Sequence, residues 1–454
     1  MGNKTERIRQ SADVSGAARD VVGEGSQGAQ GARPDVEPLG AKVRAVFAGG
    51  PLGSSPLMSA LAFGLYMSWV YLACFSTKLY PGYAVTQGMA AQGQLASFLG
   101  YLTWVAVCVA TYRKLSQRWN SRVAVVGVLA SAGTACIAAA SLFADPAVAR
   151  VLVIGASLVT GLSTACIMVA WALQFARNGA KASLQVGGGL VLSFAITCIV
   201  LPLPFELAAG LIMLLPAASA LAVVRAGDLA EADPDHTPTP SAPPDAEFLR
   251  LPWQLALGLS ALGLAYGMAY GFAFEYAEAG IEVSIACLLV NGIIGAVVLL
   301  FALRFGKNFG YSAANLAILP IAGFAQCMIA VLQTQFLPAS FFCMRLAYVL
   351  FDVVLWLQLP KVFERIGTIR TFLVSRLFLE GAVAVGVVVR EAEVMRLVMR
   401  GRSGAYVQEN LFISKSTFQT HMRNLYKKLD VHTNQELLDL LEATLDEQRD
   451  ARGA

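Results

Sequence analysis

Apolar stretches of about 20 residues follow one another from residue 57 to residue 389, and this repetition restricts the possible fold more than any other feature. A helix that crosses the hydrocarbon core of a bilayer, about 30 Å thick, needs about 20 apolar residues. Lipid offers the backbone no water, so such segments form helices whose hydrogen bonds are internal. The sequence therefore predicts an all-α protein, mostly a polytopic transmembrane helical bundle of about 11 to 12 helices in two halves.

Composition and motifs exclude several other classes of protein. Of the 454 residues, 56% are hydrophobic and only 14% are charged, against about 25% charged in a typical soluble domain. The chain contains no Walker loop, no histidine pair with metal spacing and no nucleophile elbow, so we expect it not to be an enzyme. The eight cysteines stand singly in apolar stretches, and we expect neither a metal nor another cofactor.

The chain divides into segments by composition. Residues 1–50 are predicted to be a disordered cytoplasmic tail, and residues 225–250, with the sequence DPDHTPTPSAPPD, a cytoplasmic linker. Residues 51–224 are predicted to form the first six-helix membrane half, and residues 251–389 the second half, either complete or one helix short. The predicted spans are 57–77, 93–112, 122–143, 151–176, 184–204, 206–224, 253–274, 281–303, 311–332, 337–359 and, less clearly, 371–389.

Basic residues in the short loops predict the orientation of the bundle. Cytoplasmic loops are enriched in Lys and Arg. Arginines and lysines gather on one predicted side, and the opposite side holds Glu275, Glu278 and Glu282. The basic residues are Arg113, Lys114, Arg118, Arg122, Arg177, Lys181, Arg225, Arg250, Arg304, Lys307, Lys361, Arg365 and Arg370. We expect a multi-pass protein of the cytoplasmic membrane, in contact with lipid, with its N-terminus facing the cytoplasm.

Two six-helix halves joined by a long polar loop resemble the major facilitator superfamily. The resemblance covers residues 50–389 and implies a cavity between the halves near the bilayer midplane. The RWNSR sequence at 118–122 lacks the Gly and Asp of the usual superfamily signature in the corresponding loop, which argues against ordinary transport.

The character of the chain changes at Arg390, and residues 390–446 predict a small helical domain. Val394, Leu397 and Val398 have the spacing of one face of a helix. Gly401 is placed to end this first helix of the domain. Ser403 can cap a second helix that points Val407 and Leu411 inward, and Ser416 can cap a third. The expected inner face of the third helix consists of Phe418, Met422, Leu425 and Leu429.

The outer face of the third helix is polar and basic. Such a face fits the major groove of double-stranded DNA, where side chains meet base edges and phosphates. The predicted DNA-binding residues are Lys415, Thr417, Gln419, Thr420, Arg423 and Lys427.

These landmarks, in their order and spacing, resemble the LuxR-type (GerE-like) helix-turn-helix domain. The resemblance implies that Gln419, Thr420 and Arg423 carry most of the DNA contact. It also implies that the last helix forms a homodimer, through a stripe of Leu437, Leu438, Leu441 and Leu445. The chain departs from the family at Gln408, where a small residue is usual, and at Gln419, where a basic residue is usual. These departures predict weaker or altered DNA recognition.

Charged residues inside the predicted spans mark a candidate site. Ionisable side chains are costly in lipid and usually face a cavity or one another. Arg345 and Asp352 share one helix face, and Arg376 and Glu380 are an i, i+4 pair. They are candidates for binding an unknown small-molecule signal, and the alternative is structural pairing or snorkelling. Further candidates to line the cavity are Gln174, Asn291, Asn315 and Gln326.

The number of crossings is constrained by the function that the C-terminal domain implies. With a cytoplasmic N-terminus, eleven crossings would leave this domain outside the cell. Residues 371–389 are then either an interfacial or half-inserted helix, or the chain lacks a twelfth helix and a linker. We expect a membrane-bound regulator that binds DNA in response to a signal sensed by the membrane part. The alternative is a membrane transporter with a regulatory or degenerate C-terminal domain.

Overall fold

The structure is a computed structural model that describes ten continuous stretches and a few separate positions. The stretches are 56–74, 89–112, 120–143, 145–178, 182–231, 253–275, 280–305, 337–366, 369–400 and 402–411. The separate positions are 76, 78–80, 418, 419, 422, 426, 431, 433, 435–437, 439 and 440. All regular secondary structure within these residues is helical, which confirms the all-α fold class.

Among the described residues, six α-helices lie before the proline-rich stretch and five lie after it. The first six are α3 (Pro56–Cys74), α5 (Met89–Thr111), α6 (Asn120–Ala139), α7 (Pro146–Asn178), α8 (Ala182–Val200) and α9 (Phe205–Glu231). The others are α10 (Trp253–Glu275), α11 (Gly280–Phe305), α13 (Leu337–Ile366), α14 (Arg370–Met399) and α15 (Gly404–Leu411). A short 3₁₀ helix, η2 (Ala140–Leu142), follows α6.

Each predicted span that the structure describes lies on one of these helices, but the span predicted for 184–204 is too long, because α8 ends at Val200 and a turn follows. The span at 311–332 and the tail at 1–50 lie outside the described residues. Helix α9 continues to Glu231, past residue 225, from which the linker is predicted. The acidic and proline-rich sequence that marks the linker begins only after that point.

Local signals explain where individual helices begin. Pro146 opens α7 at a position where its missing N–H costs no helical hydrogen bond. The Asp145 side chain caps this end, because its Oδ1 accepts a hydrogen bond of 2.8 Å from the Ala147 N–H. Pro202 and Pro204 lie in the short turn that separates α8 from α9.

The outer surface of the bundle is apolar. Side chains as large as Val125, Val151 and Leu300 are 61%, 72% and 61% exposed, where a protein in water would usually present polar groups. In the part of the chain that the structure describes, six helical segments are long and apolar enough to cross a membrane by length and composition: Gln92–Thr111, Arg122–Ala139, Pro146–Ala176, Ala182–Val200, Phe205–Arg225 and Phe342–Lys361.

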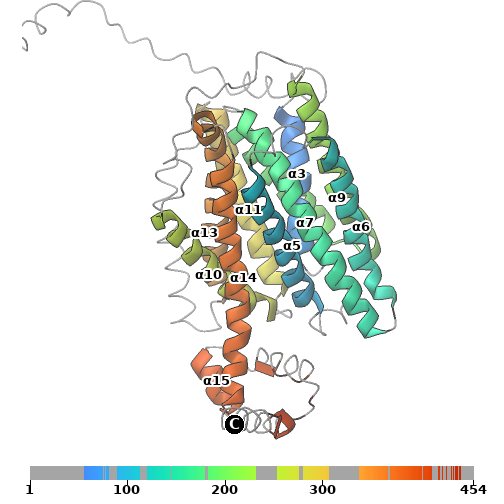
Figure 1. Ribbon diagram of the computed structural model, residues 1–454, viewed down its shortest axis with the longest axis vertical. Helices are drawn as coiled ribbons and strands as arrows, with labels where there is room; N and C mark the ends of the chain where they lie inside the picture. Colours follow the sequence, from blue (N-terminus) through green and yellow to red (C-terminus); the bar gives the residue numbers. More distant parts are fainter. Residues whose placement is uncertain are drawn as a thin grey trace, which may run out of the picture. The chain divides into compact units, whose positions relative to one another are not determined.

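The helices of both halves pack into one bundle (Figure 1). Within the first half, α3 packs on α8, α5 on α7 and α6 on α9, and α10 packs on α14 in the second half. The halves meet where α8 contacts α11, α5 contacts α14 and α7 contacts α13. An aromatic core joins them, in which Phe63 packs edge-to-face against Trp171, Phe175 and Trp356 at centroid distances of 4.9 to 5.4 Å.

Helix α14 is unbroken from the bundle to the C-terminal domain, as Figure 1 shows. It includes the doubtful stretch 371–389 and crosses the predicted domain boundary at residue 390. A Cβ at Gly263 or Gly267 of α10 would collide with the backbone of α14 at Leu379 or Val383. This close Gly-x-x-x-Gly approach favours a helix packed within the bundle over one lying at its edge.

Candidate ligand cavity and DNA-binding domain

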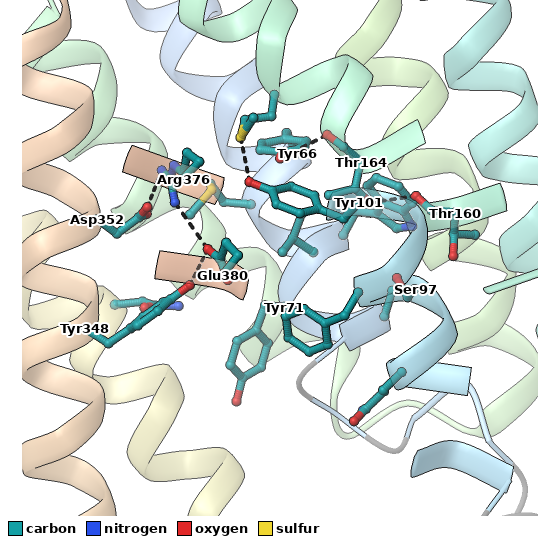
Figure 2. A pocket seen from close by; sticks show the side chains of 18 of the residues that line it. Tyr66, Tyr71, Ser97, Tyr101, Thr160, Thr164, Tyr348, Asp352, Arg376 and Glu380 are labelled. Carbon is teal, nitrogen blue, oxygen red and sulfur yellow. Dashed lines mark hydrogen bonds and ion pairs between the residues drawn. The ribbon is translucent and has the colours of Figure 1, made fainter. Parts of the chain in front are cut away.

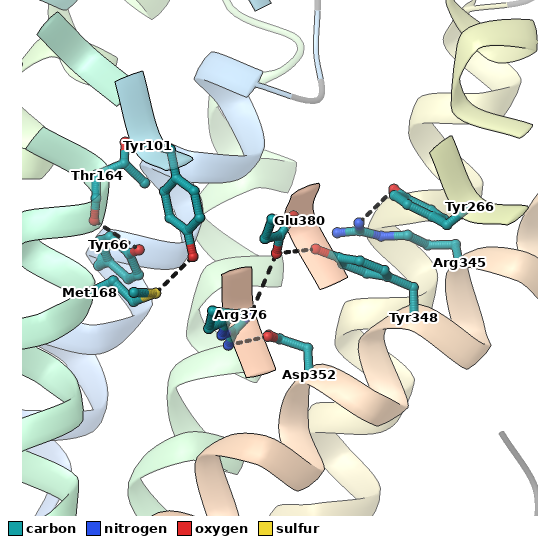
Figure 3. Close-up of polar contacts among 10 residues, drawn as sticks. All are labelled: Tyr66, Tyr101, Thr164, Met168, Tyr266, Arg345, Tyr348, Asp352, Arg376 and Glu380. Carbon is teal, nitrogen blue, oxygen red and sulfur yellow. Dashed lines mark hydrogen bonds and ion pairs between the residues drawn. The ribbon is translucent and has the colours of Figure 1, made fainter. Parts of the chain in front are cut away.

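The four charged residues singled out in the spans lie together on α13 and α14, and we call them the charge cluster: Arg345, Asp352, Arg376 and Glu380. Each is 5 to 7% exposed. Arg376 joins two of the others, because its guanidinium pairs with the Asp352 carboxylate across the helices and lies 3.5 Å from Glu380 Oε1 (Figure 3). Asp352 therefore pairs with a different helix and not with Arg345 on its own helix face.

Glu380 has a second partner on α13. The Tyr348 hydroxyl donates a hydrogen bond of 2.6 Å to Glu380 Oε1. A carboxylate with both a guanidinium and a phenol as partners is compensated for the loss of water. α13 and α14 are thus joined by Arg376–Asp352 and by Tyr348–Glu380.

Aromatic rings surround both guanidinium groups. Arg345 donates a hydrogen bond of 2.8 Å to the Tyr266 hydroxyl, and its guanidinium lies 5.8 and 5.5 Å from the Tyr266 and Tyr348 ring centroids. These two rings are stacked at 4.2 Å. The Arg376 guanidinium lies 5.3 Å from the Trp356 ring centroid. Cation–π contacts of this kind stabilise a positive charge away from water.

The charge cluster forms one wall of a cavity of about 120 Å³ between the two halves (Figure 2). The opposite wall comes from α3, α5 and α7, and it is uncharged. It contains Tyr66, Ser97, Tyr101, Thr160 and Thr164. The cavity thus has a charged side from the second half and a hydroxyl-rich side from the first.

Hydrogen bonds fix the tyrosines of the uncharged wall. The Tyr101 hydroxyl donates to Met168 Sδ at 2.9 Å, and the Tyr66 hydroxyl donates to the Thr164 carbonyl oxygen at 3.3 Å. A thioether is a weak acceptor, so a better acceptor in the cavity could replace Met168 at little cost.

The four amide side chains expected to line the cavity lie in different places. Asn291 lines the cavity. Gln174 is buried on α7 but is not among the described lining residues. Asn315 and Gln326 lie outside the described residues. The sequence did not predict the tyrosines and hydroxyls of the first half as lining residues. Such residues are common in apolar helices, and their spacing does not indicate that α3, α5 and α7 meet at a cavity.

The C-terminal domain has a hydrophobic core of its own. Val398, Val407 and Met422 are buried in it, as the sequence predicts, together with Val431 and Leu437. Partly buried Leu397, Phe418 and Tyr426 pack against them. Residues from the end of α14, from α15 and from the region after residue 417 therefore fold together.

The helix ends of this domain follow the predicted signals. The Arg402 N–H bonds to the Leu397 carbonyl oxygen at 3.3 Å, as in a Schellman-type helix end, although Gly401 itself lies outside the described residues. Ser403 caps α15, because its Oγ accepts a hydrogen bond of 3.2 Å from the Tyr406 N–H. Gln408 is half-buried on α15.

Part of the predicted DNA-recognition helix is described. Phe418, Met422 and Tyr426 follow one another every four residues and face the core, while Gln419 is helical and exposed. Partial burial raises the pKa of the Tyr426 phenol above its ordinary value. The other predicted DNA-binding residues, namely Lys415, Thr417, Thr420, Arg423 and Lys427, lie outside the described residues, as do Leu425 and Leu429.

The last helix corrects the predicted dimer stripe. Thr433 caps it by accepting a hydrogen bond of 3.1 Å from the Glu436 N–H. Leu437, predicted to face a second copy, is 1% exposed and packs in the domain core. It cannot contribute to a dimer surface, whereas Leu440 is 40% exposed. Leu438, Leu441 and Leu445 lie outside the described residues.

Comparison with known proteins concerns this C-terminal domain. Residues 389–441 match the luxR family of bacterial regulatory proteins. A stretch of 49 residues, 11% of the chain, is 39% identical to the uncharacterized response regulatory protein YgeK of Escherichia coli (strain K12) and covers 33% of that protein. The chain thus spans about a third of the curated relative that it matches. The matches support a LuxR-type helix-turn-helix domain at the C-terminus.

Proposed function

We propose that this chain, whose C-terminal domain is of the LuxR type, is a membrane-bound transcriptional regulator that binds DNA according to whether its membrane cavity is occupied. The proposal rests on one observation, the unbroken course of helix α14 from the cavity to the C-terminal domain. This helix holds Arg376 and Glu380 at the cavity and Val398 in the core of the DNA-binding domain.

The apolar outer surface supports a bundle embedded in lipid. Large exposed side chains such as Val151 and Leu300 are unfavourable in water but suit a hydrocarbon solvent. The cavity between the two halves, lined from both, is similar to the midplane site of proteins built like the major facilitator superfamily.

Helix α14 offers a physical route from signal to DNA. A ligand that contacts Glu380 or Arg376 changes the balance of contacts that hold α14 against α13. A ligand shifts a conformational equilibrium only if it binds one state better, as it would if a movement of α14 against α13 altered the contacts of the ligand. The response would be a change in how two tethered DNA-binding domains pair on their site.

DNA binding is tested with residues 387–454, which contain the separate core of the domain. Fluorescence anisotropy on a duplex from the promoter of the chain's own gene, measured over a salt series, should give tighter binding than on a scrambled duplex. Replacing Arg423 with Ala should weaken binding by about 1 to 3 kcal/mol if it reads a base, or flatten the salt slope by about one if it contacts a phosphate. Equal and weak binding to both duplexes at low salt would contradict the proposal.

The cavity also favours a second candidate function, a transporter whose C-terminal domain is a regulatory appendage. A transporter and a sensor differ in whether the bound molecule crosses the membrane. Uptake by vesicles that contain the purified chain, compared with empty vesicles, separates the two.

A further inference from the structure

We propose that the cavity binds a small aromatic molecule that carries no net charge, of the size of one ring with a hydrogen-bonding substituent. This deepens the proposed sensing function and rests on it. Charge, shape and unused hydrogen-bonding groups each restrict the ligand.

The charges of the wall cancel. The charged side chains among the described lining residues are two arginines, Arg345 and Arg376, and two carboxylates, Asp352 and Glu380. Arg376 pairs with both carboxylates. A net charge added to a buried and balanced site has no counter-ion, and an uncompensated buried charge is strongly unfavourable. An uncharged molecule avoids this cost.

The size of the cavity limits the ligand to about one ring. An apolar cavity of about 150 Å³ binds benzene. The volume here is smaller, about 120 Å³, and the cavity is partly open, so a single ring is the largest group that it can enclose. Aromatic side chains, among them Tyr66, Tyr101, Tyr348 and Trp356, contribute flat surfaces to the walls. Aromatic rings pack favourably against one another, either offset or edge-to-face.

Two buried uncharged polar groups on the cavity wall are available to a ligand. Within the described part of the chain, the Ser157 hydroxyl and the Trp356 indole N–H have no hydrogen-bond partner, although these residues are only 1% and 2% exposed. Ser157 lies on α7 and Trp356 on α13, so one group comes from each half. Buried polar groups are normally hydrogen-bonded. A substituent that accepts a hydrogen bond would satisfy the indole, which can only donate.

An isosteric series tests the charge directly. Benzamide, benzoate and benzamidine have nearly the same shape. Benzamide carries no charge, benzoate carries one negative charge and benzamidine carries one positive charge. We expect benzamide to raise the melting temperature of the purified full-length chain in detergent, with a Kd at least tenfold lower than that of either ion. Cyclohexanecarboxamide, which is uncharged but not aromatic, should bind more weakly than benzamide.

Variants place the binding in the cavity. Ser157→Ala and Tyr101→Phe each remove one hydroxyl from the lining and should weaken benzamide binding several-fold. Tyr112→Phe removes a phenol hydroxyl outside the lining and should leave it unchanged. Glu380→Gln keeps an acceptor for Tyr348 but leaves one positive charge in excess, so it should shift the preference toward benzoate.

Other results would overturn the inference. Stronger binding of benzoate or benzamidine by the unaltered chain would show that the site prefers an ion. An equal loss in the Tyr112→Phe control would place the binding elsewhere, and no shift with any member of the series would exclude this ligand class. None of these results concerns promoter binding by residues 387–454, so a failure here is distinguishable from a failure of the proposed function.

Discussion

The Arg376 guanidinium of α14 pairs with the Asp352 carboxylate of α13 in the interior of the bundle. Both side chains are at least nine-tenths buried, and the same guanidinium also lies near Glu380. This pair holds the helix that continues into the DNA-binding domain against a helix that lines the cavity.

Replacing Asp352 with Asn should destabilise the bundle. The substitution keeps the shape of the side chain but leaves Arg376 with Glu380 as its remaining described carboxylate partner. Removing one member of a buried ion pair typically costs about 3 to 5 kcal/mol, and the remaining partner should reduce this cost. A lower melting temperature of the purified chain checks the expectation. The exposed Glu206 offers a control, because Glu206→Gln makes the same chemical change where water solvates the carboxylate. Equal melting temperatures for both variants would contradict a stabilising role of the pair.

Replacing Gln419 with Ala should weaken promoter recognition. Gln419 is exposed on the described part of the recognition helix, and a glutamine that forms a bidentate contact with adenine contributes about 1 to 3 kcal/mol of discrimination. Anisotropy titrations with single base-pair changes should locate the base pair at which discrimination is lost. Gln435→Ala, also exposed but on the last helix, is the matched control. If the two variants bind equally well, Gln419 does not read the DNA.

Replacing Gly404 with Ala should destabilise the C-terminal domain. A Cβ at this position would lie 2.7 Å from Phe418 Cε1, so the ring or the helix must move. Overpacking of this kind costs about 1 to 3 kcal/mol. Urea unfolding of residues 387–454 measures the cost. In a Phe418→Leu background the ring is absent, and the same substitution should cost clearly less. Equal costs in both backgrounds would rule out this contact as the cause.

Labelling should find the DNA-binding domain in the cytoplasm. In a chain whose eight cysteines are replaced, Ser403→Cys should resist a membrane-impermeant thiol reagent in intact cells and react after lysis.

Arg118→Cys, in a segment that the positive-inside rule assigns to the cytoplasm, reports the orientation of the bundle. If α14 crosses the membrane, the basic residues near Arg370 and the domain after Met399 lie on opposite sides, and only one of the two cysteines is protected. Protection of both means that the number of crossings between them is even. Labelling of Ser403→Cys in intact cells would exclude a role in transcription.

Hydropathy was sufficient to predict the helices and their class, because a span of 20 apolar residues has few alternatives to a helix. Caps such as Ser403 and core positions such as Val407 and Met422 were also predictable, since they depend on residues within one or two turns.

Contacts between distant segments could not be predicted in the same way. The sequence places Arg345 and Asp352 on one helix face, but only the packing of α13 on α14 brings Arg376 to Asp352. The burial of Leu437 has the same origin. A leucine stripe fits a dimer surface or a domain core equally well, and the arrangement of neighbouring helices decides which side chains are covered.

Because α14 is unbroken between Glu380 and Val398, the number of residues in this stretch sets the rotation of the following domain about the helix axis. Each residue inserted there would rotate the following domain by about 100° and advance it by about 1.5 Å. One or two extra residues would therefore turn the recognition surface toward a different direction, whereas seven, close to two full turns, would nearly restore it. Under the proposed function, the length of this stretch would therefore matter to signalling as much as the side chains at its two ends.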